Sequence, residues 1–195
     1  MDLHTPIRVI EGTDVDIISP FPLLYLERLI KWTHQYKSLI THDFTPSDDA
    51  SLTEGFKDHI ENQLSYAVVD KHNKIGLPSD EPIVVGGYFI EASTPVNVYT
   101  HVVSQRRCWG KGLMDEAAGM VVKDLFDTQP QLQRISAYMV ANNRAVIHFI
   151  EKQGFAREGV FRDMAQIKGK LLDVMHYGMT RKKFNSMTPI GVEEN

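Results

Sequence analysis

Apolar and polar residues alternate, or apolar residues cluster, in several short stretches of the chain that are typical of β-strands. A first strand is predicted at 6–11 (PIRVIE), where the alternation is clear. Further strands are predicted at 65–70, 83–90, 97–103 and 134–140. Turn-forming polar, glycine and proline residues separate most of these stretches. The pattern therefore predicts a sheet whose strands are spread over most of the chain.

Helical periodicity is strongest directly after the strand at 97–103. From Leu113 onward, apolar residues recur at helical spacing for about four turns. Asp115 and Glu116 suit the positive N-terminal end of such a helix. Two earlier helices are predicted at about 23–36 and 48–62.

The second half of the chain carries clear signals for helix ends. Asn143 offers an N-cap for a further helix, and Gly154 offers a left-handed stop at its end. Beyond it the pattern predicts a hairpin of two strands, 160–167 and 171–179, joined by a turn at 168–170.

These elements give the order strand, two helices, three strands, helix, strand, helix, two strands. The fold class that we predict is α/β (α+β mixed), with a central mixed sheet of about seven strands and helices on both faces. Residues 1–184 are expected to form a single domain, and residues 185–195 a flexible tail.

Composition narrows the function classes. The chain has 195 residues, of which 43% are hydrophobic and 24% charged, as in ordinary globular proteins. The net charge of −4 argues against a large nucleic-acid surface. A single cysteine, Cys108, excludes an internal disulfide and a cysteine-rich zinc site, and the histidines lack metal-ligand spacing. The start of the chain does not resemble a signal peptide, and no window is apolar enough to span a membrane, so we expect a cytoplasmic protein.

The stretch 106–112 (RRCWGKG) is the candidate ligand loop. It places two glycines between a predicted strand and the N-terminus of the strongest helix, where backbone N–H groups and the helix dipole favour an anion. A tight turn that needs glycine only for its backbone angles explains the same residues. A P-loop is excluded because Gln105 stands where its first glycine belongs, and the dinucleotide fingerprint would need glycine at Asp115.

Residues 107–112 (RCWGKG) fit the Arg/Gln-x-x-Gly-x-Gly/Ala motif, and in this respect the chain resembles the GNAT superfamily of N-acetyltransferases. The motif lies between the fourth predicted strand and the third predicted helix, as it does in that family. Asn143 and the segment 151–155 (EKQGF) are similar to the family's fourth helix. The pattern over 154–177 looks like the RimJ/RimL branch, which includes enzymes that acetylate protein N-termini. The resemblance covers about residues 95–183.

The resemblance implies that the ligand is acetyl-CoA, and it implies a splay between strands 4 and 5. The N–H groups of 108–113 would hold the pyrophosphate, and the backbone of the fourth strand would pair with the pantetheine arm like an added strand. The cofactor-binding residues implied in this way are His101, Val102, Val103, Arg107, Cys108, Trp109, Gly110, Lys111, Gly112, Leu113 and Asn143. The two arginines before Cys108 also favour a lowered thiol pKa there.

The acid and base of the reaction are left open by the sequence. Glu91, His101 and Tyr138 are the catalytic candidates, and a core or surface role is the alternative for each. The chain departs from the family at Ile150, where many members carry a tyrosine that protonates the departing thiolate. It departs from the RimJ/RimL branch at Val146, where Ser or Thr is usual.

The leading hypothesis is an acetyl-CoA-dependent N-acetyltransferase in which a primary amine, possibly a protein N-terminus, attacks the thioester directly. An alternative acceptor is a small amine drawn by acids such as Asp43, Asp48 and Asp49. A third hypothesis, prompted by the missing tyrosine, is a catalytically inert module that binds CoA or a protein partner. No metal, nucleic acid or membrane is expected, and a homodimer stays open.

Overall fold

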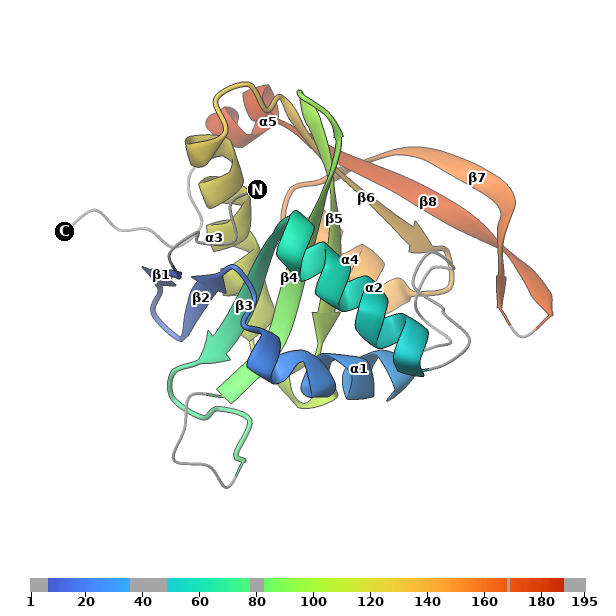
Figure 1. Ribbon diagram of the computed structural model, residues 1–195. Helices are drawn as coiled ribbons and strands as arrows, with labels where there is room; N and C mark the ends of the chain where they lie inside the picture. Colours follow the sequence, from blue (N-terminus) through green and yellow to red (C-terminus); the bar gives the residue numbers. More distant parts are fainter. Residues whose placement is uncertain (1–6, 36–48, 78–82, 168, 188–195) are drawn as a thin grey trace.

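The computed structural model describes residues 7–35, 49–77, 83–167 and 169–187. Its centre is an eight-stranded sheet in the order β1-β2-β3-β4-β5-β6-β8-β7 (Figure 1). The strands are β1 (Arg8–Glu11), β2 (Val15–Ser19), β3 (Leu64–Asp70), β4 (Ile83–Thr94), β5 (Asn97–Ser104), β6 (Arg134–Val140), β7 (Ala156–Ile167) and β8 (Lys170–Thr180). The helices are α1 (Leu26–Gln35), α2 (Asp49–Asn62), α3 (Leu113–Thr128), α4 (Arg144–Lys152) and α5 (Arg181–Ser186).

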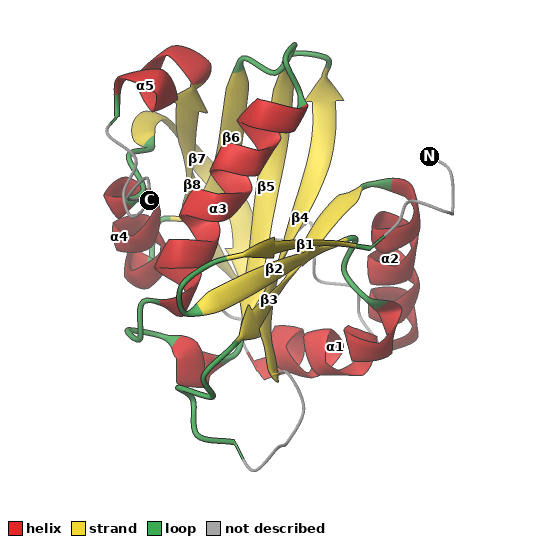
Figure 2. Cartoon of the chain, turned by 90° about the vertical axis from the view of Figure 1, so that its left-hand side faces the viewer, coloured by secondary structure: helices red, strands yellow, loops and turns green. Residues whose placement is uncertain are grey.

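Helices cover both faces of the sheet, as the sequence predicts. Helices α1 and α2 lie on one face, and α3 and α4 on the other (Figures 1 and 2). One core cluster joins the sheet to α3 and α4 through side chains such as Tyr88, Leu113 and Ile150. A second cluster joins the opposite face to α1 and α2 through Leu29, Phe56 and Phe89.

Two elements were missed by the sequence prediction. Strand β2 adds an eighth strand, with Val15 and Ile17 fully buried and pairing antiparallel to β3. Its five residues are followed directly by Pro20, and such turn signals concealed the short alternation. Helix α5 forms after β8, where Thr180 caps it and Phe184 packs on Phe126.

Buried and half-buried carboxylates fix the position of α3. Asp124 accepts a hydrogen bond from the Tyr66 hydroxyl at 2.7 Å and pairs with Arg8, which ties α3 to β3 and β1. Glu116, in the first turn of α3, accepts hydrogen bonds from the backbone N–H groups of Thr13 and Asp14. The N-terminus of α3 is therefore held against the loop that joins β1 and β2.

The splay that was predicted between strands 4 and 5 is present between β5 and β6, which are the fourth and fifth strands of the prediction. These strands pair in parallel only from Asn97 to Tyr99 on β5, opposite residues 134–136 of β6. Beyond this point β5 continues along β4 to Ser104, and β6 continues along β8 to Val140. Because each strand follows its antiparallel neighbour, the two diverge, and no described strand pairs with this edge of β5 beyond Tyr99.

Candidate active site

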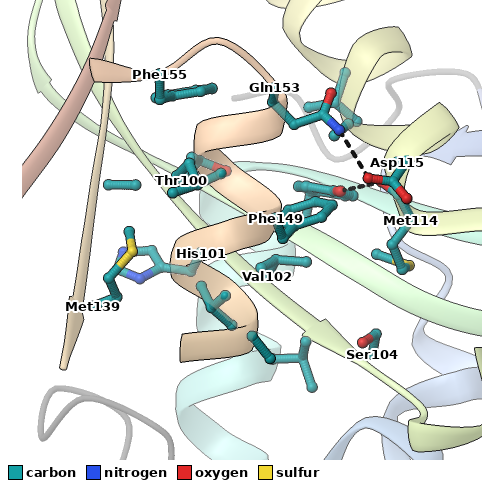
Figure 3. A pocket seen from close by; sticks show the side chains of 18 of the residues that line it. Thr100, His101, Val102, Ser104, Met114, Asp115, Met139, Phe149, Gln153 and Phe155 are labelled. Atoms are coloured by element: carbon teal, nitrogen blue, oxygen red, sulfur yellow. Dashed lines mark hydrogen bonds between the residues drawn. The ribbon is translucent and has the colours of Figure 1, made fainter. Parts of the chain in front are cut away.

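A cavity of about 590 Å³ lies at the splay. Its walls come from β5, β6, α3 and α4, and it reaches through to Phe56 and Phe89 on the face covered by α1 and α2. Figure 3 shows His101 and Met139 at one side of this space, with Phe149 of α4 over it. Most of the lining side chains are apolar, so polar groups there lie in a poorly solvated environment.

The glycine loop forms a short 3-10 turn, Arg106–Cys108, followed by the start of α3. Gly110 and Gly112 have φ values of 71° and 80°, in the region that favours glycine, and Gly112 is the N-cap of α3. The N–H groups of Cys108, Trp109 and Lys111 donate within the turn. The donors left to face a ligand are those of Gly110, Gly112 and the first turn of α3, including Leu113. The loop therefore combines a tight turn with a helix N-terminus suited to an anion.

Cys108 behaves differently from the expectation of a reactive thiol. Its side chain is 1% exposed, and its Sγ donates to the Gln105 carbonyl oxygen at 2.8 Å. Burial raises the pKa of the Cys108 thiol to about 11, so the expected lowering beside two arginines is wrong. The thiol is therefore held protonated near neutral pH, inside the core.

The charged side chains of the glycine loop lie outside the cavity. Arg107 and Lys111 are exposed and do not line the cavity. Trp109 is 41% exposed, and its indole N–H donates to Ser104 Oγ at 3.1 Å, which places it at the edge of the loop. Asp115, in the first turn of α3, pairs with Lys152 of α4 at 3.2 Å, so its negative charge is partly balanced.

The three catalytic candidates come from three strands and lie on the face covered by α1 and α2. His101 Nε2 lies 3.5 Å from Glu91 Oε2, and the Glu91 side chain is 55% exposed, within reach of solvent. His101 and Tyr138 both line the cavity. The structure therefore brings Glu91 and His101 together and places Tyr138 at the same opening.

Tyr138 is part of a row of rings across β5, β6 and β8. Its ring stacks between those of Tyr99 and His176, with centroids 4.9 and 4.7 Å away. The Tyr99 and Tyr138 hydroxyl oxygens lie 3.0 Å apart, within hydrogen-bond distance. Burial, together with this contact, raises the pKa of Tyr138 to about 12, so its hydroxyl keeps its proton near neutral pH.

His59 of α2 lies close to the pair of His101 and Glu91. Its ring meets Phe89 edge-on, with centroids 5.5 Å apart, and the residue is 8% exposed. Burial lowers the pKa of His59, the neighbouring His101 lowers it further, and Glu91 opposes the shift. The imidazole is therefore held neutral.

Helix α4 contributes both predicted features of its sequence. Asn143 is the N-cap, and its Oδ1 accepts the Val146 N–H at 3.3 Å, as the sequence predicted. Asn143 also lines the cavity. Ile150 contributes an apolar surface at the place where many members of the family that the sequence resembles carry a tyrosine.

Sequence reasoning missed several lining residues, among them Thr100, Ser104 and Met139. Side chains alternate between the two faces of β5, so Thr100 lies on the same face as Val102 and opposite His101. This alternation was the signal in the sequence that could have identified Thr100 as a lining residue. What the pattern lacked was the point at which β5 and β6 separate. The acids Asp43 and Asp48 lie outside the described residues, as does the side chain of Asp49.

A splayed sheet, a free strand edge and a glycine-bearing helix N-terminus face one apolar cavity, an arrangement that suits an extended ligand carrying a phosphate at one end. The family described as "Acetyltransferase (GNAT) domain" matches residues 18–156, and the chain belongs to this family of acetyltransferases.

Relatives support the same assignment. The chain is 32% identical over 79 residues to the uncharacterized N-acetyltransferase p20 of Bacillus licheniformis, a match that covers 40% of this chain and 44% of that protein. A GNAT-family acetyltransferase from Bacillus anthracis has a similar structure, with a TM-score of 0.72 at 18% identity over 90% of this chain and 99% of that one. A chimera of spermidine N-acetyltransferase SpeG from Vibrio cholerae with hSSAT gives a TM-score of 0.72 at 15% identity, over 90% and 100%. These structures show the shared fold, while the RimJ/RimL branch stays a prediction.

Two further observations concern the described residues alone. None of their helices combines the length and apolarity that crossing a bilayer requires. Their His, Cys, Asp and Glu side chains form no cluster of three or more that is arranged to hold a metal ion.

Proposed function

We propose that the protein transfers the acetyl group of acetyl-CoA to a primary amine by direct attack of the amine on the thioester. The observation that carries this proposal is the cavity at the splay, which runs from the glycine loop to the His101 and Tyr138 side chains. One end of it suits a phosphate-bearing carrier, and the other end offers groups that move protons.

The residues fit acetyl-CoA. The free N–H groups of Gly110, Gly112 and Leu113 would hold the pyrophosphate, with Arg107 and Lys111 as nearby cations. No described strand pairs with the β6-facing edge of β5 beyond Tyr99, so the backbone there at His101, Val102 and Val103 is open to an extended arm. Asn143 lies at the start of α4 against the same space. When bound, acetyl-CoA supplies the activated acyl group.

The side chains on the other face support proton removal from the amine. Glu91 is the proposed base, directly or through His101, because the two lie 3.5 Å apart at the opening. The raised pKa of Tyr138 makes its hydroxyl a hydrogen-bond donor rather than a base. Backbone N–H groups on the free edge of β5 would polarise the acyl carbonyl.

An extended acceptor such as a protein N-terminus is the first candidate. The β7–β8 hairpin projects beyond the rest of the sheet (Figure 1), and it carries exposed apolar side chains at Phe161, Met164 and Leu171. Phe161 meets the Tyr138 ring at a centroid distance of 5.9 Å, so this surface continues to the catalytic face. A peptide would find contacts there beyond its first residue.

A small amine is the second candidate. The exposed carboxylate of Glu91 at the opening would attract a cation, and one similar fold belongs to a spermidine N-acetyltransferase. The match in fold carries no information on the acceptor by itself.

Two measurements test the proposal. Calorimetric titration should show acetyl-CoA binding, and a concentration 100 times the Kd should add about 2.7 kcal/mol to the free energy of unfolding. Thiol release should then be followed with peptides of varied N-terminus, with spermidine and with amino acids. Faster release with peptides supports an N-terminal acceptor, and faster release with free amines supports the second candidate. Binding without release from any acceptor would favour an inert module, and no binding would end the proposal.

A further inference from the structure

Thr100 presents a hydroxyl group for which the described residues provide no partner. Its Oγ1 is buried and makes no hydrogen bond, although buried hydroxyls nearly always make one. The residue lines the cavity, and Figure 3 shows it beside α4. A buried, unpaired donor on a cavity wall points to a ligand atom that accepts its hydrogen bond.

The position of Thr100 along β5 identifies which part of a ligand it meets. Tyr99 is the last residue of β5 that pairs with β6, so Thr100 is the first beyond the point of separation. The glycine loop lies at the other end, after Ser104, and the strand rise between Ser104 and Thr100 is about 13 Å. A carrier anchored by its phosphates at the loop therefore brings its far, acyl-bearing end to Thr100.

Other polar groups on the same wall are already engaged or absent. The Tyr88 hydroxyl donates to the Met114 carbonyl oxygen, and Ser104 Oγ accepts from Trp109. Ile150, which stands in the place of the family's tyrosine, offers only methyl and methylene groups. Among the described hydroxyls that line the cavity, Thr100 is the one placed to replace that tyrosine.

We propose that the Thr100 hydroxyl donates a hydrogen bond to the thioester sulfur and stabilises the thiolate as it leaves. This inference rests on the proposed function. The amine nitrogen forms the new C–N bond, the C–S bond breaks, and its electron pair remains on sulfur. The amine proton passes to Glu91, and the thiolate takes a proton from solvent after release, so that the products are an amide and CoA thiol.

A hydrogen bond, rather than full proton transfer, is the role that suits threonine. Its hydroxyl is too weak an acid to protonate a thiolate. In an apolar cavity, however, a hydrogen bond to a charged atom is strong because little water competes for that atom. One such donor is worth about tenfold to a hundredfold in rate.

Thr100→Val tests this role because valine keeps the shape and the strand preference of threonine but removes the hydroxyl. We expect kcat to fall about tenfold to a hundredfold, with the Kd of acetyl-CoA nearly unchanged. Thr100→Ser retains the hydroxyl, and it should recover most of the lost rate. Thermal unfolding of both variants checks that they are folded.

A second readout does not depend on turnover. The ultraviolet absorbance of the CoA thiolate, titrated in the enzyme–CoA complex, reports the pKa of the bound thiol. We expect that pKa to be about one to two units higher in Thr100→Val than in the wild type or in Thr100→Ser. This measurement also works if no acceptor has been found.

The outcomes separate the two proposals. If the wild type binds no CoA or acetyl-CoA, the proposed function and this inference both fall. If it binds and Thr100→Val changes neither kcat nor the thiol pKa, only this inference is overturned. An increase in the Kd of acetyl-CoA with unchanged kcat and thiol pKa would also overturn it, because Thr100 would then act in binding alone.

Discussion

The glycine loop offers a ligand backbone groups, whereas the catalytic face offers it side chains. The loop presents backbone groups: Gly110 and Gly112 lie at positive φ, and the exposed side chains of Arg107 and Lys111 stand aside. The catalytic face instead relies on side chains from separate strands, as in the pair of Glu91 and His101. The glycine loop is formed by consecutive residues, whereas the catalytic face forms only when the strands of the sheet pair. Substitutions should therefore affect binding at the loop and turnover at the catalytic face.

The largest effect is expected at Glu91. Glu91→Gln removes the proposed base and should lower kcat by about 10²–10⁴-fold, with the Kd of acetyl-CoA unchanged. Steady-state thiol release and calorimetry measure the two quantities. Glu54→Gln, on the exposed side of α2, is the matched control and should leave both unchanged. If Glu91→Gln is fully active, the base lies elsewhere, and His101→Asn becomes the next variant to test.

A smaller effect, on the Kd of acetyl-CoA rather than on kcat, is expected at Gly112. Gly112→Val forces a β-branched residue into φ of 80°, and the left-handed conformation costs about 1–2 kcal/mol. Because a Cβ there would meet no atom within 4 Å, this cost comes from the backbone rather than from a clash. The free loop of the variant relieves this cost by leaving the left-handed conformation, and binding has to restore it. We therefore expect the Kd of acetyl-CoA to rise about tenfold, with little change in kcat.

Gly119 provides the control for the loop. It lies in the middle of α3, and a Cβ there would also meet nothing within 4 Å. Gly119→Ala should raise the free energy of unfolding by up to about 1 kcal/mol and leave the Kd unchanged. An unchanged Kd in Gly112→Val would show that the loop does not hold the carrier.

The smallest effect concerns the pH dependence of stability, which should trace to the catalytic face. The pKa of His59 is lowered below its ordinary value of 6.5, so the unfolded chain takes up this proton before the folded protein does. Stability is therefore lost as the pH falls through 6.5. Between about pH 7.5 and about pH 5.5 we therefore expect His59 to reduce the free energy of unfolding.

Denaturant unfolding of His59→Phe measures this contribution, since phenylalanine retains a ring against Phe89. The variant should show a smaller loss of stability at the lower pH than the wild type, although the similarly lowered pKa of His176 leaves part of it. His148→Gln, which removes an exposed imidazole, is the control. An identical loss in wild type and His59→Phe would exclude His59 as the source.

Most of the elements and the ligand loop could be predicted from the amino-acid sequence, because these features depend on residues that are close together along the chain. The periodicity from Leu113 predicted α3, the cap at Asn143 and the stop at Gly154 bounded α4, and both were confirmed. Gly110 and Gly112 were visible for the same reason, since a positive φ and a helix N-terminus are properties of neighbouring residues. The short β2 and α5 escaped because few residues carried their pattern.

Which side chains meet could not be predicted in this way, because the contacts join segments that are far apart in the sequence. The 3.5 Å contact of Glu91 with His101 depends on the register of β4 with β5, and the Tyr99–Tyr138 contact depends on how far β5 pairs with β6. Burial also reversed the local expectation for Cys108, because its pKa follows the surrounding core and not the arginines beside it in sequence. Thr100 gained its unpaired hydroxyl in the same way, from the point where two strands part. Distances and dielectric environment arise from packing between distant segments, and one sequence read along its length does not contain them.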